Sequence, residues 1–359
     1  MMEKQYNHER KAFIITDQGN EVAIVPFLFP DINHRGDVFS EVNVAKYSFS
    51  FYYKKDVPEI DYHLVNINVG AGGGHPQRLG WIIPLAALTS EDDDTRAFPF
   101  LNDFVFWAFC YLLSQDTILK RIAEDRDAFS DILDTEYPDG CIFIIDKDQM
   151  PEGITEKHLE LSLARNGFFQ VPSGYKNPQI VLPKGAELSL TPASEIINAE
   201  GHYLRDYLDE FLKQHAYNSN SFIRFFYLYQ IVEILLDAEM IELLRDFANK
   251  IENDKATYLV ADKALQKNTD SARFSRVVEH SGITIDQYAD LDRVCNAFLG
   301  SDPAKPLKNP ESVYQVRNHI VHRFRKAASD VSTVKDICDY LELYLYDLLI
   351  NYKLPNANG

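Results

Sequence analysis

The segment that most constrains the fold is Phe222–Leu236, which is apolar on nearly all sides and is interrupted by Arg224, Gln230 and Glu233. Its periodicity predicts a helix over Phe222–Ile251. Because a helix with apolar residues all round must be buried, we expect it at the centre of a helical bundle. The charged residues within it argue against a membrane span.

Helical periodicity continues through the rest of the C-terminal half. Capping residues followed by proline favour helix starts at Thr191-Pro192 and at Asn309-Pro310. Everything after Thr191 is therefore predicted to be helical. The remaining predicted helices are a short one around Tyr258–Val260, one over Tyr288–Leu299 and a last one from Val331 to about Tyr352.

The N-terminal half has the period of strands instead. Asp17–Asn20 is a plausible hairpin turn between the first two predicted strands, and the third and fourth strands alternate apolar with polar residues, so each should bury one face. A helix is predicted over Phe98–Leu133, followed by a short buried strand at Cys141–Ile145. The first four predicted strands are Ala12–Ile15, Val22–Val25, Tyr47–Tyr53 and His63–Val69.

Four prolines and two glycines between Val171 and Pro192 end the strand-like periodicity and predict a domain boundary. The fold class predicted is α+β. Residues 1–185 form a sheet-rich N-terminal module with a helix, in a sensor or regulatory role, and residues 191–355 form an all-α bundle.

Composition and charge limit the classes of function that the protein can have. The chain has 359 residues, 46% of them hydrophobic, and a formal net charge of -18. This acidity excludes a protein that coats nucleic acid, because such binding needs many cationic contacts. The cysteines lie far apart, without a C-x-x-C pair or a signal peptide before them, which predicts buried thiols in a cytoplasmic protein and no membrane partner. The four are Cys110, Cys141, Cys295 and Cys338.

Gly70–Gly74 follows the fourth predicted strand, where a glycine run can bind phosphate through backbone amides. His75 stands where a dinucleotide fingerprint needs glycine, and neither Gly-Lys-Ser/Thr nor a helix start follows, so we predict a flexible loop. A phosphate-binding enzyme built on this loop is the weakest hypothesis. The acidic run Glu91–Asp94 lacks regular ligand spacing and is predicted to be a solvated loop. No cofactor or metal is expected.

The segment Arg317–Lys326 contains four cations, two imidazoles, one carboxamide and no acid. Such a local reversal of sign in an acidic protein suggests that a polyanion is bound here. At about 100° per residue, His322 points almost opposite to the core face of its helix, Asn318 lies one turn before it, and Arg317 lies on the flank of the core. The predicted core face is Val313, Val316, Ile320, Phe324 and Ala327.

Glu233 falls within the apolar stripe of the central helix, where a lone carboxylate would cost several kcal/mol unless it is paired or protonated. Arg317 is the first candidate for its partner, since a carboxylate behind the guanidinium would orient it towards a phosphate. Arg224 is the rival. The stripe consists of Phe222, Phe226, Tyr229, Val232 and Leu236.

Histidine and arginine suffice to cleave RNA through its own 2′-hydroxyl, which needs a base, an acid and a cation near the phosphorus. Arg317 and His322 are about 140° apart around their helix, so we expect a second subunit to complete the site. His319 and His322 could instead bind zinc, but no third ligand is evident. An ordinary charged helix surface is the plainest alternative.

Arg317–His322 matches the R-N-x-x-x-H form of the Arg-x4-6-His signature of the HEPN superfamily, and the chain resembles that superfamily. Residues 222–235 look like the central helix of its Apea-like branch, and Val313–Val316 is similar to the lead-in of that branch. The likeness covers roughly residues 194–352. It implies a helical bundle that dimerises and a metal-independent endoribonuclease with Arg317, Asn318 and His322 at the interface.

Apea-like proteins belong largely to bacterial anti-phage and toxin systems, so the resemblance also implies an abortive-infection effector. Its RNA substrate would be tRNA or mRNA, and a phage-derived trigger or partner protein would act at the N-terminal module. The alternative is a catalytically silent HEPN-like protein that dimerises and binds a ligand or nucleic acid.

Overall fold

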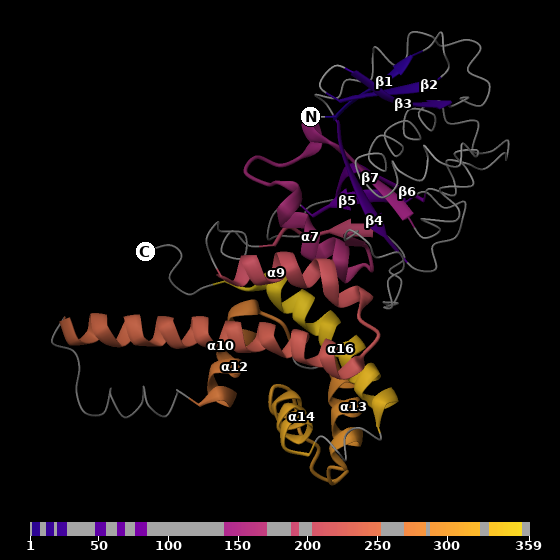
Figure 1. Cartoon of the computed structure of the whole chain (residues 1–359). Helices are drawn as coiled ribbons and strands as arrows, with labels where there is room; N and C mark the ends of the chain where they lie inside the picture. The colour runs from indigo at the N-terminus through magenta and orange to yellow at the C-terminus, as the bar shows by residue number, and fades with distance from the viewer. Residues whose placement is uncertain are drawn as a thin grey trace. The chain divides into compact units, whose positions relative to one another are not determined.

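The computed structural model describes residues 2–7, 12–17, 20–26, 47–54, 63–68, 76–84, 140–170, 188–193, 203–252, 269–284, 288–323 and 330–353 (Figure 1). The chain divides into two compact units, residues 1–153 with 167–190 and residues 154–166 with 191–359. The predictions for Gly70–Gly74, Glu91–Asp94, Phe98–Leu133 and Tyr258–Val260 lie outside the described residues. The fold is mixed α+β, with sheets in the N-terminal half and helices in the C-terminal half.

The first unit contains two sheets. One is antiparallel in the order β1-β2-β3, and the other has six strands in the order β8-β4-β7-β6-β5-β9, in which only the pairing of β5 with β9 is parallel. All five predicted strands are present, and the register that pairs Asp17 with Asn20 agrees with the predicted hairpin. The strands are β1 Met2–Asn7, β2 Ala12–Asp17, β3 Asn20–Pro26, β4 Tyr47–Tyr53, β5 His63–Ile67, β6 Gln77–Pro84, β7 Gly140–Asp146, β8 Phe169–Gln170 and β9 Leu188–Leu190.

Strand β7 lies inside the larger sheet and is buried along its whole length, as its continuous apolar run predicts. Its neighbour β6 approaches closely at Gly80, where a Cβ atom would lie 1.8 Å from the carbonyl oxygen of Ile144. The prediction of alternating burial fails for β4, because Phe51, Tyr52 and Tyr53 are all buried. Because successive side chains of a strand point to opposite faces, both faces of the sheet are covered at this end of β4.

The second unit is helical. Segment 154–166, which lies before the predicted domain boundary, belongs to this unit because α7 packs on α16. The predicted helix start at Pro192 is wrong: Thr191, Pro192 and Ala193 are not helical, and their segment is instead hydrogen-bonded to α7. The helices are α7 Glu156–Arg165, α9 Tyr203–Gln214, α10 Ser221–Glu252, α12 Asp270–Ser281, α13 Ala289–Leu299, α14 Glu311–His322 and α16 Val331–Asn351, with a 3-10 turn η2 at His215–Tyr217.

Helix α10 is the centre of this unit, as predicted. It packs against α16, α12 and α9, and the first half of the helix buries Phe225, Leu228, Ile231 and Val232 completely. The side chains of Ile241 and Leu244 are exposed, so burial is confined to the N-terminal part of the helix. None of the described helices is both long and apolar enough to cross a membrane.

A buried polar network joins α10 to α16 and η2. Oε2 of Glu342 on α16 accepts from Arg224 Nη2 at 2.5 Å, and Oε1 accepts from the hydroxyl of Tyr346 at 2.8 Å. His215 Nε2 also lies 2.8 Å from Oε1. Arg224 also pairs with Asp339 at 2.5 Å. Burial by itself would raise the pKa of Glu342, but the charges and hydrogen bonds of His215 and Arg224 lower it to about 2.

Three of the cysteines are described, and all three are buried free thiols, as predicted: Cys141, Cys295 and Cys338. Burial raises the pKa of Cys295, and it raises the pKa of Cys338 to about 12. Neither thiol is poised for reaction as a thiolate at neutral pH.

The substitution Glu342→Gln is expected to destabilise the helical unit by about 3 kcal/mol at neutral pH, because it removes the charge that Arg224 is buried against. A carboxylate whose pKa is lower in the folded protein than in the unfolded chain stabilises the fold at pH values above its unfolded pKa, near 4.5. That stabilisation is lost as the pH falls through the folded pKa, about 2. The difference in melting temperature between parent and variant should therefore shrink between pH 4.5 and 2. Glu210→Gln, at an exposed position on α9, is the control; a gap that does not change with pH would contradict the assignment.

Candidate functional site

Helix α14 carries the sequence-predicted residues. Its core face is confirmed for Val313, Val316 and Ile320, which are fully buried, whereas Phe324 and Ala327 lie outside the described residues. The helix begins at Glu311 with Pro310 at the N-cap, so the predicted role of Asn309 as cap is wrong. The Asn309 side chain is buried instead of capping the exposed amides.

Arg317 is held by three neighbours. Its Nη2 lies 3.5 Å from Glu233 Oε1, its Nη1 donates to Asn318 Oδ1 at 3.2 Å, and its Cζ lies 5.8 Å from the ring centre of Tyr229. The Arg317 side chain remains 33% exposed. It is therefore oriented by α10 and its own helix while part of the guanidinium still faces solvent.

The predicted contact between Glu233 and Arg317 is present, but the predicted burial of Glu233 is wrong. Its side chain is 42% exposed, because Phe226 and Glu233 lie at the outer edge of the apolar stripe and Phe226 is itself 44% exposed. The buried stripe of α10 passes through Phe225 in place of Phe226. As a partly exposed ion pair, Glu233 with Arg317 stabilises the fold by less than about 1 kcal/mol.

Arg224, the rival partner, is not near this pair. It is buried and bound to Glu342 and Asp339 in the network described above. Its guanidinium is therefore a structural cation, which corrects its assignment as a candidate site residue.

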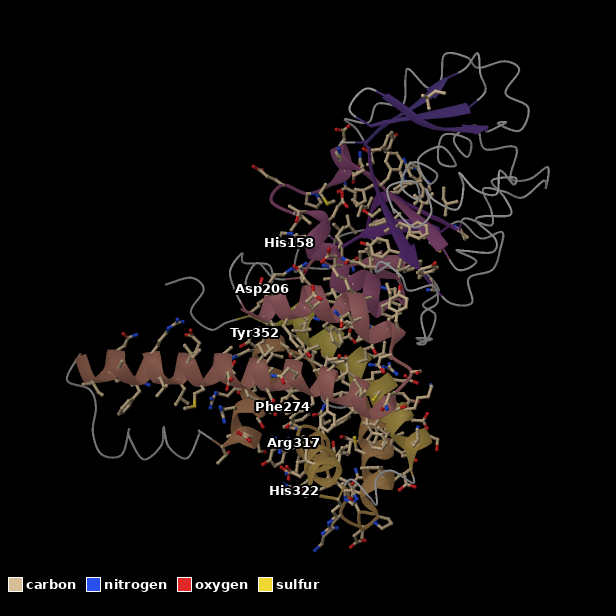
Figure 2. The ribbon with its side chains drawn as sticks, viewed as in Figure 1. His158, Asp206, Phe274, Arg317, His322 and Tyr352 are labelled. Atoms are coloured by element: carbon tan, nitrogen blue, oxygen red, sulfur yellow. The ribbon has the colours of Figure 1, made fainter. Side chains whose placement is uncertain are left out.

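His322 ends α14 and is exposed, together with Val321 and Arg323. Arg317 lies on the side of α14 towards α10 and His322 at the far end of the helix, and no hydrogen bond joins the two (Figure 2). Among the described residues, no side chain orients the His322 imidazole. One chain thus supplies the two chemical groups without bringing them together.

His319 is directed differently from His322. Its ring makes an edge contact with Phe298 of α13, with ring centres 5.2 Å apart. Within the described parts of the chain, no three histidine, cysteine or acidic side chains are grouped as a metal site. His319 therefore contributes to the packing of α13 against α14.

A second cluster, which the sequence did not predict, surrounds Glu239 on α10. This carboxylate is 1% exposed and accepts from His280 Nδ1 at 2.6 Å, the Tyr352 hydroxyl at 2.9 Å and Arg276 Nε at 3.3 Å. Arg276 and His280 are one turn apart on α12, and Tyr352 follows α16. The only sequence signal was a carboxylate next to the buried face of the central helix, since its partners come from two other segments.

Comparison of the chain with protein-family models, with curated proteins and with solved structures gave no match.

Replacing Glu233 should make the Arg317 guanidinium more reactive, because loss of the carboxylate removes one of the contacts that restrain it. We expect Glu233→Gln to increase the rate at which phenylglyoxal modifies Arg317, read by peptide mass spectrometry. Arg245, whose side chain is 68% exposed, is the internal control and should be unaffected. An unchanged rate at Arg317 would show that the contact with Glu233 does not restrain it in solution.

Proposed function

We propose that the helical unit is a metal-independent endoribonuclease that cleaves RNA through attack of its own 2′-hydroxyl. Arg317 binds the scissile phosphate and stabilises the extra charge on it, and His322 transfers a proton. This assignment follows the resemblance of Arg317–His322 to the HEPN signature. The observation that carries it is the arrangement around Arg317, which is restrained on one side and open to solvent on the other.

The contacts of Arg317 suit a phosphate clamp. A guanidinium donates two parallel hydrogen bonds to phosphate oxygens, and its use as a clamp requires a fixed plane. Glu233, the Tyr229 ring and Asn318 all contact this guanidinium. Asn318, the polar residue after the arginine, therefore acts in this proposal by positioning Arg317.

His322 supplies the proton-transfer group. Imidazole is the side chain most often used as a general acid or base, and that of His322 is exposed. Because it lies away from Arg317 and nothing described orients it, the proposal requires a second copy of the chain at this end of α14. The enzyme is thus proposed to be a homodimer in which the arginine of one subunit acts with the histidine of its partner.

The biological setting is proposed from the resemblance alone. It suggests an effector of a bacterial anti-phage or toxin system that acts on tRNA or mRNA in the cytoplasm. The sheet-containing unit would then respond to a trigger or partner protein.

Purified protein is expected to degrade RNA in the presence of EDTA and to leave 2′,3′-cyclic phosphate ends. Arg317→Ala and His322→Ala should each lower the cleavage rate by at least about 100-fold, since each removes a group acting in the transition state. Arg317 is half-buried and His322 is exposed, so the circular dichroism spectrum should stay the same and the melting temperature should fall by no more than a few degrees. Arg245→Ala is the control for loss of one surface cation, and normal cleavage by either site variant would overturn the assignment.

Glu233→Gln is expected to lower cleavage only several-fold, because the pair is partly exposed and the Tyr229 and Asn318 contacts remain. The loss should appear in kcat more than in KM if Glu233 orients Arg317 for the transition state. Equal cleavage by parent and variant would remove Glu233 from the mechanism and leave Arg317 in it.

The alternative is a catalytically silent protein that dimerises and binds a ligand or nucleic acid. The observation that favours it is the lack of any described partner that orients His322. RNA binding without cleavage, tested with phage-infected extract as a source of trigger, would support this alternative.

A further inference from the structure

Helix α10 carries an exposed phenylalanine, Phe226, close to the contacts that hold Arg317. Phenylalanine is usually buried, yet 44% of this residue is exposed. Its ring centre lies 6.2 Å from that of Phe225 with the two planes 73° apart, and this is its one ring contact within the described ranges. Much of the Phe226 ring is therefore open to a ligand.

Phe225 connects this ring to the surroundings of Arg317. It is fully buried and stacks on Tyr229, with ring centres 6.0 Å apart and an angle of 19° between the planes. The Tyr229 ring centre is in turn 5.8 Å from Arg317 Cζ. Because Phe226 and Tyr229 are three residues apart on one helix, their Cβ atoms are roughly 5–6 Å apart. The exposed ring thus lies about 10 Å from the guanidinium.

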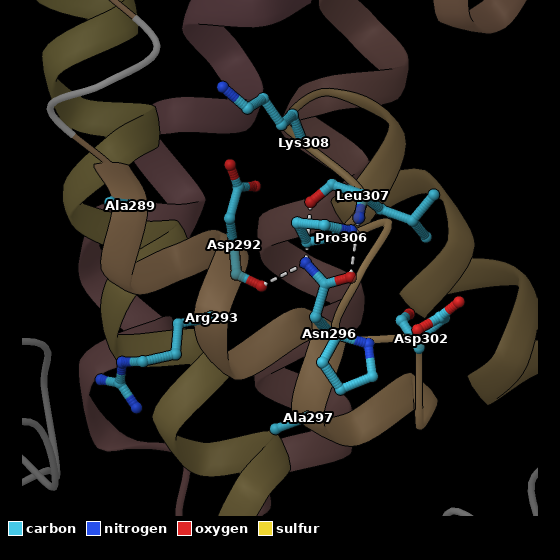
Figure 3. Close-up of a pocket in the computed structure, with 11 residues that line it drawn as sticks. Ala289, Asp292, Arg293, Asn296, Ala297, Asp302, Pro306, Leu307 and Lys308 are labelled. Atoms are coloured by element: carbon cyan, nitrogen blue, oxygen red, sulfur yellow. Dashed lines mark hydrogen bonds between the residues drawn. The ribbon is translucent and has the colours of Figure 1, made fainter.

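The position of Arg317 is also fixed from the side of α13. Ser312, in the first turn of α14, donates through Oγ to Asp292 of α13 at 2.6 Å. The loop that leads into α14 is tied to α13 by Asn296 (Figure 3). Its amide donates to the Leu307 carbonyl oxygen at 2.7 Å, and its Oδ1 accepts from the Leu307 amide at 2.8 Å. These bonds hold α14 in place, so the fold sets the distance between the exposed ring and the guanidinium.

This distance suits a single strand of RNA. The proposed function places the scissile phosphate at Arg317, and about 10 Å is covered by three nucleotides of a stacked strand, at roughly 3.4 Å each, or by fewer nucleotides of an extended one. Proteins bind single-stranded RNA largely by stacking its unpaired bases on aromatic side chains. Phe226 is therefore placed to stack on a base near the scissile bond.

The area of the exposed patch favours a base over a protein partner. The patch consists of Phe226 with Ile223 and Tyr227, which are 43% and 36% exposed. Together they expose about 300 Å², whereas each partner in a stable protein complex buries roughly 800 Å². The patch ends at Gln230, which is polar and exposed. Stacking needs the face of a single ring, which this patch supplies.

Gln230 lies one turn after Phe226 on the same face of α10. Its side-chain amide can both donate to and accept from the edge of a stacked base, so it selects no single base. The acid that follows on this face, Glu233, is paired with Arg317. We expect stacking at Phe226 to tolerate all four bases.

We propose that Phe226 is a stacking platform for an unpaired base of the RNA substrate, within about three nucleotides of the phosphate that Arg317 binds. The inference rests on the proposed function for the position of that phosphate, and it deepens that function by assigning single-stranded RNA as the substrate class. Phe226 takes no part in proton transfer, so its loss should raise KM and leave kcat nearly unchanged.

The test is titration of the full-length protein, in EDTA, with a short single strand of 2′-O-methyl RNA, which has no free 2′-hydroxyl and cannot be cleaved by the proposed reaction. A second strand has abasic sites in place of its central bases, and binding is read by fluorescence anisotropy. The parent should bind the base-containing strand at least about tenfold more tightly than the abasic strand. Phe226→Ala and Phe226→Leu should each reduce this preference to less than about threefold, because neither side chain has a flat ring.

Phe226→Tyr should keep the preference of the parent, because it keeps the ring. Tyr227→Leu is the matched control, since it removes an exposed ring that points about 100° away around the helix. All variants should bind the abasic strand as the parent does. Sedimentation measures the oligomeric state of each protein in parallel.

Three results would overturn the proposal: no RNA binding by the parent, equal binding of the two strands by the parent, or a Phe226→Leu protein that keeps the preference. Dissociation of the Phe226→Leu protein into monomers would also overturn it and assign the ring to an interface between copies. Cleavage of unmodified RNA is measured separately. A preference that depends on Phe226 without any cleavage removes the proposed function and leaves the platform, whereas cleavage with a KM that Phe226→Ala does not change removes the platform and leaves the function.

Discussion

The helical unit depends on the charge of Glu342, a fully buried carboxylate that would be costly without its partners. Arg224 and His215 supply them, and in doing so they join α10 and η2 to α16. The position of α10 follows from this network. Helix α10 also carries Tyr229 and Glu233, which contact Arg317 of α14. The orientation of Arg317 therefore depends on the network that fixes α10 against α16.

Three carboxylates of this unit show how burial decides the role of a charge. Glu342 and Glu239 are buried and each accepts several hydrogen bonds, so both hold helices together. Glu233 is partly exposed, and its contact with Arg317 adds little stability. The guanidinium in this pair is restrained without being enclosed, so it can still bind a ligand.

Much of this arrangement could be predicted from the sequence, because it rests on periodicity. The all-round apolar pattern of residues 222–236 predicted the central helix, and the core face of α14 predicted that Arg317 lies on its flank. The contact between Arg317 and Glu233 was predicted because Glu233 is an isolated acid in an apolar stripe and Arg317 is a cation on the flank of the core. The exposure of Glu233 did not follow, because Phe225 and Phe226 are both apolar and the pattern does not say which of them faces the core. The partners of Arg224 and Glu239 come from distant segments, and no local pattern encodes them.

If Arg317 of one subunit acts with His322 of another, mixing two inactive variants should restore activity. Arg317→Ala and His322→Ala proteins are each expected to be inactive, but a mixed dimer retains one site with an intact arginine and an intact histidine. RNA cleavage should therefore return when the two variants are mixed and allowed to exchange subunits. A mixture that forms mixed dimers and stays inactive, while the parent protein cleaves RNA, would contradict a site shared in this way.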